Sequence, residues 1–315
     1  MADEAAEKVT TAQTTSANET PVVDSEHDPD ARTIVITGVS TGIGYAIAQE
    51  LIAHGYRVIG TVRKQEDADR VRAALGQRAH VVLMDVADDE QVQRAAGEIT
   101  AMVGERGIAA LVNNAGIAVA GPLMHVDLEE LRYQFDVNVV GVVAMTQAML
   151  PLLGGRKDSP MPPGRVLNLG SVSAHVTYPF LAPYAASKRA LEAISDGMRR
   201  ELALYGIDVI VMVVGAVQTP IWSKVSAEDL DRYAKTDYAS AVAQMAATTS
   251  DLSKNSMPVA RVAVAARRAL EQAKPKARHI LVNDYWRGWL LTRLIPTRLF
   301  DYALTRQFGL TRTEK

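Results

Sequence analysis

A tyrosine and a lysine, Tyr184 and Lys188, lie four residues apart, and a serine, Ser171, precedes the tyrosine by thirteen residues. On a helix, residues i and i+4 share a face, so the first two side chains are expected to point the same way. A free phenol has a pKa near ~10 and is a poor base at neutral pH, whereas a neighbouring cation stabilises its phenolate form. The spacing therefore predicts a phenol that can move a proton, with Ser171 placed to hydrogen-bond a substrate oxygen.

A glycine-rich turn opens the part of the chain that has the pattern of a folded protein. The sequence TGVSTGIG, Thr37–Gly44, follows a run of β-branched residues and precedes a segment of helical periodicity. Gly38 permits a tight turn, Gly42 lets the backbone approach a phosphate, and Gly44 lets the helix pack close to the strand. Glycine turns are common, but a turn between a strand and a helix indicates a dinucleotide phosphate site at the helix N-terminus. The Tyr–Lys pair, a coincidence in most sequences, gains its meaning from this turn and from Ser171.

The end of the next predicted strand favours one form of nicotinamide coenzyme. Dinucleotide folds that select NAD usually place an acidic residue there for the ribose hydroxyls. This chain has Val62 instead, followed by Arg63 and Lys64. Because an arginine can hold a 2′-phosphate through paired charge-assisted hydrogen bonds, the sequence predicts NADP as the cofactor rather than NAD. The alternative is that Arg63 and Lys64 only solvate the end of a strand.

Strand-like apolar runs alternate with segments of helical periodicity along the chain. Strands are expected at 33–37, 57–62, 79–84, 108–112, 165–169, 208–214 and 278–282, and helices at 43–53, 88–103, 128–152 and 185–205. Strands separated by helices favour a parallel sheet that is covered on both faces, with right-handed crossovers. We therefore predict an α/β fold, a doubly wound parallel sheet (Rossmann fold), in a single domain of residues 32–284. The long connection 215–258 is typical of a lid or binding loop.

The composition excludes several classes of protein. The 315 residues include no cysteine, which removes disulfides, thiolate metal sites and cysteine nucleophiles, and His54, His80 and His125 have no partners at metal-ligand spacing. A net charge of −2 predicts no nucleic-acid partner. Residues 1–31 hold eight acidic residues against one lysine and lack the apolar segment of a secretory signal, so we expect a disordered acidic tail. Since no run of ~18 uncharged apolar residues occurs, no membrane-spanning helix is expected.

Residues 285–315 differ from the predicted domain that precedes them. The stretch Tyr285–Leu310 contains two of the three tryptophans together with several leucines and arginines, and Pro296 divides it into two short amphipathic pieces. One interpretation is an amphipathic helical extension that packs on its own domain or on a dimer partner. The other is a basic, aromatic-rich face in 285–310 that rests on a membrane surface or covers an apolar substrate pocket.

Three further residues are open to two interpretations. His175 follows Ser171 by four residues and could line a substrate pocket, although a loop histidine more often lies at the surface or in packing contacts. Ile221 and Trp222 could form a pocket wall or pack in a helix.

The motifs, taken together, resemble those of the short-chain dehydrogenase/reductase family over residues 33–283. In chain order they are TGVSTGIG, DV (Asp85–Val86), NNAG (Asn113–Gly116), FDVNVVG with Asn138, GSVSA with Ser171 and YAASK (Tyr184–Lys188). The sequences of these motifs most resemble those of the 17β-hydroxysteroid and retinol dehydrogenase-like branch. Two positions depart from the family pattern. Val214 precedes Gly215 where the family usually has proline, and NLGS replaces the usual double serine.

The resemblance implies a role for each motif residue. Tyr184 would be the general acid/base, Lys188 would lower its pKa and hydrogen-bond the nicotinamide ribose, and Ser171 would orient the substrate oxygen. Asn138 would kink its helix and hold a water that links Lys188 to solvent. Besides Tyr184 and Lys188, the cofactor-binding residues would be Gly38, Ser40, Thr41, Ile43 and Gly44 at the pyrophosphate, Arg63 at the 2′-phosphate, Asp85 and Val86 at the adenine, Asn113, Ala115 and Gly116 on the adenine ribose side, and Val217 and Thr219 at the nicotinamide carboxamide.

The sequence thus predicts an NADP(H)-dependent oxidoreductase that transfers a hydride between nicotinamide and a secondary alcohol or carbonyl of a small-molecule substrate. The apolar extension and the branch resemblance favour a hydrophobic substrate, such as a steroid, a retinoid or a lipid-like ketone. The alternative is a non-catalytic NADP-binding sensor or scaffold of the same fold, which the intact catalytic set argues against. Family members often assemble through the helices that carry Asn138 and Tyr184, so we expect a homo-dimer or tetramer. We also expect a cytoplasmic location, or a peripheral one at a membrane surface.

Overall fold

The structure, a computed structural model, describes residues 32–219, 231–254 and 256–311, without the side chains of 249–254 and 287–288. The predicted acidic tail and the residues Ile221 and Trp222 lie outside the described residues.

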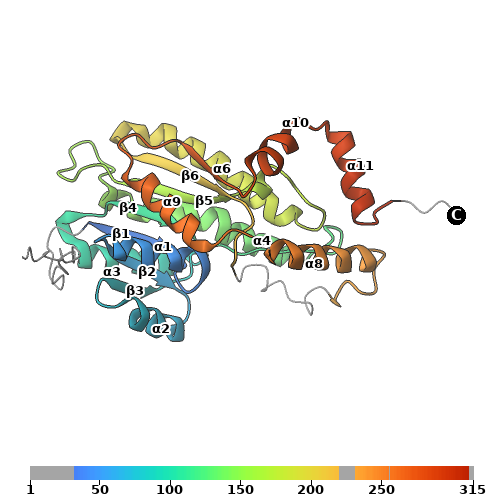
Figure 1. Ribbon diagram of the computed structural model, residues 1–315. Helices are drawn as coiled ribbons and strands as arrows, with labels where there is room; N and C mark the ends of the chain where they lie inside the picture. Colours follow the sequence, from blue (N-terminus) through green and yellow to red (C-terminus); the bar gives the residue numbers. More distant parts are fainter. Residues whose placement is uncertain (1–31, 220–230, 255, 312–315) are drawn as a thin grey trace, which may run out of the picture.

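Within those residues, seven strands form one parallel sheet in the order β3-β2-β1-β4-β5-β6-β7 (Figure 1). The strands are β1 (Thr33–Thr37), β2 (Arg57–Val62), β3 (Ala79–Leu83), β4 (Ala110–Asn113), β5 (Arg165–Ser171), β6 (Asp208–Val214) and β7 (Arg278–Leu281). Every predicted strand is present, and no strand end differs from the prediction by more than two residues. The predicted doubly wound parallel sheet is confirmed.

The strand order reverses between β1 and β4. Strand β1 pairs with β2 on one side and with β4 on the other, so that Val35 is in register with Ile59 and with Leu111. The connections that leave the carboxyl ends of β1 and β4 therefore run to opposite faces of the sheet and leave a crevice between them. This is where open α/β sheets bind their ligands.

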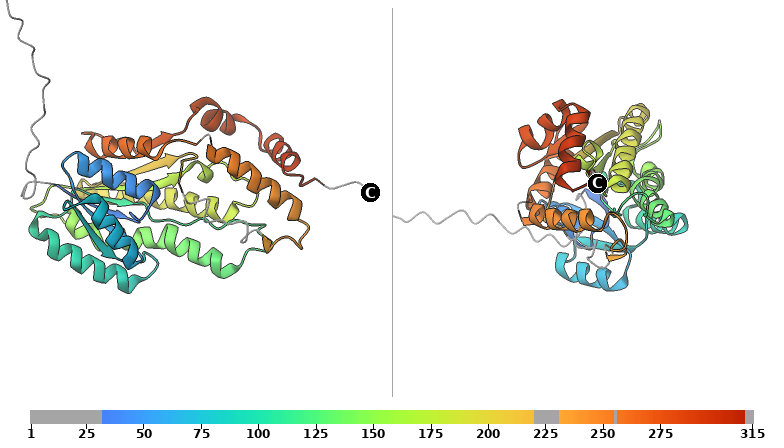
Figure 2. Two further views of the ribbon diagram at one scale, coloured as in Figure 1. Left: turned by 60° about the horizontal axis from the view of Figure 1, so that its bottom comes forward. Right: turned by 90° about the vertical axis from the view of Figure 1, so that its right-hand side faces the viewer.

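Helices cover both faces of the sheet (Figures 1 and 2). One layer consists of α1 (Gly42–Ala53), α2 (Gln65–Leu75) and α9 (Val259–Glu271), and the other of α3 (Asp89–Val103), α5 (Gly141–Met149) and α6 (Ala182–Glu201). Successive side chains of a strand point to opposite faces, so Ile34 and Ile36 join the core under the first layer and Val35 joins the core under the second. Two aliphatic cores thus hold the strand ends at fixed positions.

The stretch predicted as one helix over 128–152 is interrupted. It consists of α4 (Leu128–Phe135), a π-helical turn (Asp136–Val140), α5 and a 3-10 turn (Leu150–Leu153). π-Turns inside helices are frequently associated with functional sites, and this one contains Asn138. The interruption brings the asparagine to the crevice, as described below.

By length and composition alone, the stretch Leu128–Leu153 is apolar enough to cross a membrane, although no such helix was expected from the sequence. In the structure, 56% of its most apolar window is buried within the protein. Val137, Met145 and Met149 lie in the core under the second helical layer. The stretch therefore has the position of a core helix.

The C-terminal segment packs on its own domain. It contains a π-helical turn (Trp286–Leu291), α10 (Thr292–Leu294) and α11 (Thr297–Gln307). Trp289 packs against Val211 and Val213 of β6, and Leu304 of α11 belongs to a separate cluster with Phe180 and Tyr233. Part of the long connection 215–258 is also helical, as α8 (Ala239–Lys254), and α8 and α11 lie beyond the carboxyl ends of the strands (Figures 1 and 2). Trp289 and Leu304 of the extension thus pack on the same chain, as one of the two interpretations expects.

Several apolar side chains of the extension remain exposed. The predicted contact of this segment with a membrane surface is therefore still open to test. Trp286 is 72% exposed, Leu294 69% and Leu299 59%. We expect the protein to float with anionic liposomes, because aromatic and aliphatic side chains beside arginines suit a lipid interface. The double variant Trp286→Ser/Leu299→Ser should lose this binding. The control Leu204→Ser, which changes a leucine that is 66% exposed but lies outside the extension, should retain it. Absence of flotation by the unmodified protein would contradict the prediction.

Candidate active site

The glycine turn at the end of β1 has the backbone that its sequence predicts. Gly38 and Gly42 have positive φ angles of 73° and 66°, a conformation that side chains with a Cβ rarely adopt. The amide of Gly38 is bound to the carbonyl oxygen of Thr61 at 3.0 Å, which fixes the turn against β2. A Cβ added to Gly44 would lie 2.4 Å from the carbonyl oxygen of Gly38, so the close approach of helix and turn requires glycine.

The N-terminus of α1 is open to an anion. Its N-cap residue, Thr41, makes no side-chain hydrogen bond to the helix, and the first turn contains no acidic residue. The free amides and the helix dipole therefore favour a negatively charged group at this position.

A cavity of about 700 Å³ runs along the crevice from this turn. At one end it is lined by Arg63, Lys64 and Asp85, and at the other by Tyr184, Lys188 and Thr219. The remaining predicted residues that line it are Gly38, Ser40, Thr41, Ile43, Val86, Ala115 and Gly116. Its two ends and the anion site between them fit an extended nicotinamide dinucleotide, with the adenosine ribose at one end and the nicotinamide at the other.

Tyr184 and Lys188 line the second end of this cavity, and Ser171, which does not line it, contacts Tyr184. Helix α6 begins at Ala182 and has a proline in its first turn, where proline suits a helix start. The buried face of this helix carries both Tyr184 and Lys188. Ser171 is the last residue of β5, and its hydroxyl is hydrogen-bonded to the Tyr184 hydroxyl. Lys188 Nζ donates to the carbonyl oxygen of Leu169 at 2.8 Å and lies 5.9 Å from the centre of the Tyr184 ring.

The ionisation of these groups differs in one respect from the prediction. Burial lowers the pKa of the Lys188 ammonium to about 8, because the charged form loses its hydration. Burial also raises the pKa of the Tyr184 phenol, and the hydrogen bond from Ser171 only partly opposes this effect. The protein groups alone therefore do not produce the lowered phenol pKa that the sequence predicted. A cationic group held beside the phenol would act in the lowering direction.

Asn138 does not line the cavity but holds Ile117, which does. Its Oδ1 accepts from the amide of Ile117, and its Nδ2 donates to the carbonyl oxygen of Ile117, each at 2.9 Å. Nδ2 is also 3.0 Å from the hydroxyl of Ser187, which lies on α6 between Tyr184 and Lys188. The asparagine therefore joins the π-helical turn, the segment after β4 and α6.

Three predicted cofactor residues do not line the cavity. Asn113 is buried in the core, where its Nδ2 donates to Thr146 Oγ1 at 3.1 Å and to Asn168 Oδ1 at 2.9 Å. The expected position of Asn113 beside the coenzyme is corrected, because side chains alternate at the strand end and place this residue inside the protein. Val217 is buried and forms an isolated β-bridge with Met257. Gly44 contacts the glycine turn from the side that faces away from the cavity.

The neighbouring Asn114 lines the cavity and was not predicted as a separate site residue. Its Nδ2 donates to the carbonyl oxygens of Thr37 and Gly38 at 2.9 and 2.8 Å, so it holds the glycine turn. The second asparagine of the NNAG motif was the available signal. Thr61, Met84 and Gly170 also line the cavity, and none of them was predicted as a site residue, although Gly170 opens the GSVSA motif.

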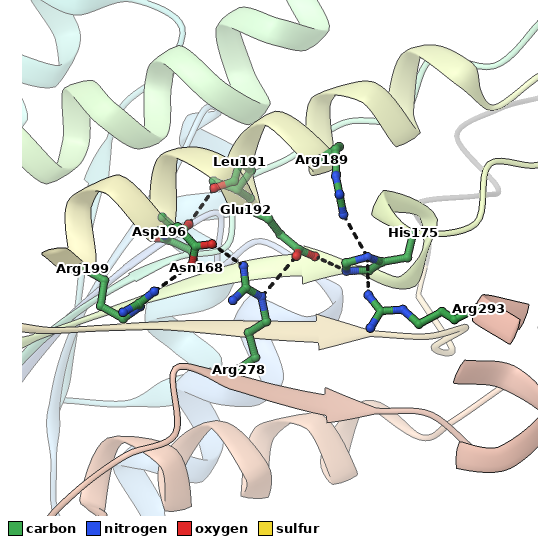
Figure 3. A network of polar contacts seen from close by, with 10 residues as sticks. Asn168, His175, Arg189, Leu191, Glu192, Asp196, Arg199, Arg278 and Arg293 are labelled. Carbon is green, nitrogen blue, oxygen red and sulfur yellow. Dashed lines mark hydrogen bonds and ion pairs between the residues drawn. The ribbon is translucent and has the colours of Figure 1, made fainter. Parts of the chain in front are cut away.

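His175 lies in packing contacts rather than at the surface (Figure 3). Its Nε2 lies 2.9 Å from Glu192 Oε1, and the two side chains are 7% and 3% exposed. Its Nδ1 lies 2.7 Å from the guanidinium of Arg293, which is stacked 4.0 Å from the centre of the Trp289 ring. On the other side, Glu192 Oε2 lies 3.4 Å from Arg278 Nε of β7. The network therefore joins the segment after Ser171, the helix that carries Tyr184 and the C-terminal extension.

Comparison with known proteins gives the class of this fold and site. The family model for short chain dehydrogenase matches residues 32–230. The chain belongs to the short-chain dehydrogenase/reductase family and is an oxidoreductase that acts on CH–OH groups with NAD or NADP. Within the part of the chain that the structure describes, no group of three histidine or acidic side chains could hold a metal ion.

Individual relatives cover most of the chain. An NADPH-dependent 3-dehydrocapnine reductase from Ornithobacterium rhinotracheale is 40% identical over 270 residues, which are 86% of this chain and 95% of that protein. Retinol dehydrogenase 16 of Mus musculus is 30% identical, with 86% and 87% of the two chains covered. The crystal structure of a short-chain dehydrogenase from Streptomyces avermitilis superimposes with a TM-score of 0.69 at 28% identity, covering 92% of this chain and all of that one.

The close fit at Gly44 makes a prediction. We expect Gly44→Ala to weaken coenzyme binding about tenfold, because overpacking costs about 1–3 kcal/mol and here displaces the turn. The dissociation constant can be measured by titration of the intrinsic fluorescence. The control is Gly97→Ala on α3, where a Cβ would meet no atom within 4 Å and alanine favours the helix. Equal affinity of the two variants would contradict the prediction.

Proposed function

We propose that the protein is an NADPH-dependent reductase of a ketone in a hydrophobic small molecule. The observation that carries the proposal is the cavity, which joins the cationic pair Arg63 and Lys64 at one end to Tyr184 and Lys188 at the other. The two cations at the first end suit a 2′-phosphate, and the other end suits proton transfer to an oxygen.

The proposed reaction divides the work between the coenzyme and the chain. A bound nicotinamide coenzyme would supply the hydride. The Tyr184 hydroxyl donates its proton to the carbonyl oxygen as the alcohol forms, and Ser171 donates a hydrogen bond to the same oxygen. The ammonium of Lys188, on the same helix, stabilises the phenolate that remains. Reprotonation of Tyr184 from solvent completes the cycle, so one ketone, one NADPH and one proton give one alcohol and one NADP.

Two observations support a hydrophobic ketone. Ala120, Phe180, Tyr233, Leu304 and Phe308 form an apolar cluster beside the segments that flank Ser171 and Tyr184. The 40% identical relative is named as a reductase of 3-dehydrocapnine and as NADPH-dependent. The sensor alternative has less support, because Asn138, Ser171, Tyr184 and Lys188 are all present. Tyr184 is hydrogen-bonded to Ser171, and it is linked to Asn138 through Ser187.

The test is NADPH oxidation followed by absorbance with 3-dehydrocapnine, a steroid ketone, a retinal and a short polar ketone. We expect oxidation with at least one of the three hydrophobic carbonyl compounds and a lower rate with NADH. A higher rate with NADH would contradict the proposed preference for NADPH. A higher rate with the short polar ketone would contradict the proposed class of substrate.

A further inference from the structure

Three side chains from three separate elements meet at the end of the cavity farthest from Tyr184, and two of them, Arg63 and Asp85, line it. Arg63 follows β2, Asp85 follows β3, and Tyr133 projects from α4. Arg63 Nη1 donates to Tyr133 Oη at 3.1 Å, and Tyr133 Oη donates to Asp85 Oδ2 at 3.2 Å. A tyrosine hydroxyl can accept one hydrogen bond while it donates another, so the three groups form a continuous relay from guanidinium to carboxylate.

The relay rests on a fixed carboxylate. Asp85 Oδ1 accepts from the amide of Ala87 at 3.1 Å, and the amide of Asp85 is held by Gln91 Oε1 at 3.1 Å. The Tyr133 phenol also keeps its proton, because burial and the Asp85 carboxylate both raise the pKa of this phenol. The hydroxyl is therefore a dependable donor to Asp85 and acceptor for Arg63.

Arg63 needs such a support. Its side chain is 53% exposed, and an exposed arginine loses conformational freedom when it is held in one position. The hydrogen bond to Tyr133 uses one of the five guanidinium N–H groups, which leaves four for other partners. Two of these are enough for bidentate recognition of a phosphate.

Tyr133 also separates Arg63 from Asp85. Arg63 Nη1 and Asp85 Oδ2 are 3.8 Å apart, which is longer than a hydrogen bond. The two groups are already within ion-pair distance, and without the hydroxyl the guanidinium could close on the carboxylate in a direct hydrogen bond. A 2′-phosphate would then have to compete with Asp85 for the same charge.

We propose that Tyr133 is a positioning residue that determines coenzyme specificity, because it holds Arg63 toward the 2′-phosphate of NADPH and takes the place of a direct hydrogen bond between Arg63 and Asp85. The inference rests on the proposed NADPH dependence. Tyr133 itself does not line the cavity, so its effect passes through Arg63.

The experiment measures the dissociation constants of NADPH and NADH separately for the whole protein. We expect Tyr133→Phe to weaken NADPH binding about fivefold, which corresponds to one hydrogen bond, and to change NADH binding by less than about twofold. In an Arg63→Leu background the same substitution should have no further effect on NADPH, since the interaction passes through Arg63. A matched control is Tyr302→Phe, which removes a Tyr–Arg hydrogen bond of 2.9 Å on α11 and should change neither constant.

The outcomes separate this inference from the proposed function. A wild-type protein that binds NADH as tightly as NADPH overturns both. A wild-type preference for NADPH that Tyr133→Phe leaves unchanged overturns only the role of Tyr133. Equal weakening of both coenzymes by Tyr133→Phe shows a merely structural role and overturns it as well.

Discussion

Replacement of Tyr184 by phenylalanine is expected to lower kcat by about a thousandfold, the range that a positioned general acid contributes. The phenol is buried, is hydrogen-bonded to Ser171 and has Lys188 one helical turn away, so it is the group best placed to protonate a substrate oxygen. Phenylalanine keeps the ring and its packing, so the dissociation constant of NADPH should change little. Steady-state rates and coenzyme titration, measured on the same preparation, check the two expectations.

A matched control is Tyr56→Phe. Tyr56 is also buried, but its hydroxyl is bound to Arg32 and Glu271, away from the cavity. This variant should retain turnover. If Tyr184→Phe retained turnover to the same extent, proton transfer by this phenol would be ruled out.

A large effect on stability is expected at Glu192. Its side chain is 3% exposed and accepts from His175 Nε2 and Arg278 Nε (Figure 3). Glu192→Ala leaves both donors without this acceptor, and His175 is too buried to find water instead. Removal of one member of a buried pair costs about 3 kcal/mol or more, and since Arg278 is one-third exposed we expect the lower end of that range. The melting temperature should fall by roughly 6–12 °C.

Two further variants test the physical cause. Glu192→Gln keeps an oxygen acceptor for His175 but loses the charge, so it should lose less stability than Glu192→Ala. Glu201→Ala changes an exposed residue of the same helix and should have little effect. Because the network joins the segment after Ser171 to the helix of Tyr184, Glu192→Ala should also lower kcat at temperatures where it is folded. A loss of stability no larger than that of Glu201→Ala would contradict the importance of the pair.

Much of the fold was predictable from neighbouring residues. The continuous β-branched run at Ile34, Val35 and Ile36 predicts a strand that is buried on both faces, and the structure has it at the predicted residues. The glycine turn was predictable for a similar reason, since a positive φ at Gly38 and Gly42 is a local property of the backbone. The i, i+4 spacing of Tyr184 and Lys188 likewise requires only one helix.

Contacts between distant residues were decided by the tertiary structure. Tyr133 lies 70 residues from Arg63, and Arg293 lies 118 residues from His175. The two asparagines of one motif also have different tasks, since Asn113 is buried in the core and Asn114 holds the glycine turn. The sequence by itself determined the strands, the turn and the Tyr–Lys pair, because their geometry depends on residues a few positions apart. Only the packed structure decided which partners brace Arg63 and His175, because no local periodicity encodes the partner that a side chain meets when helices pack on a sheet.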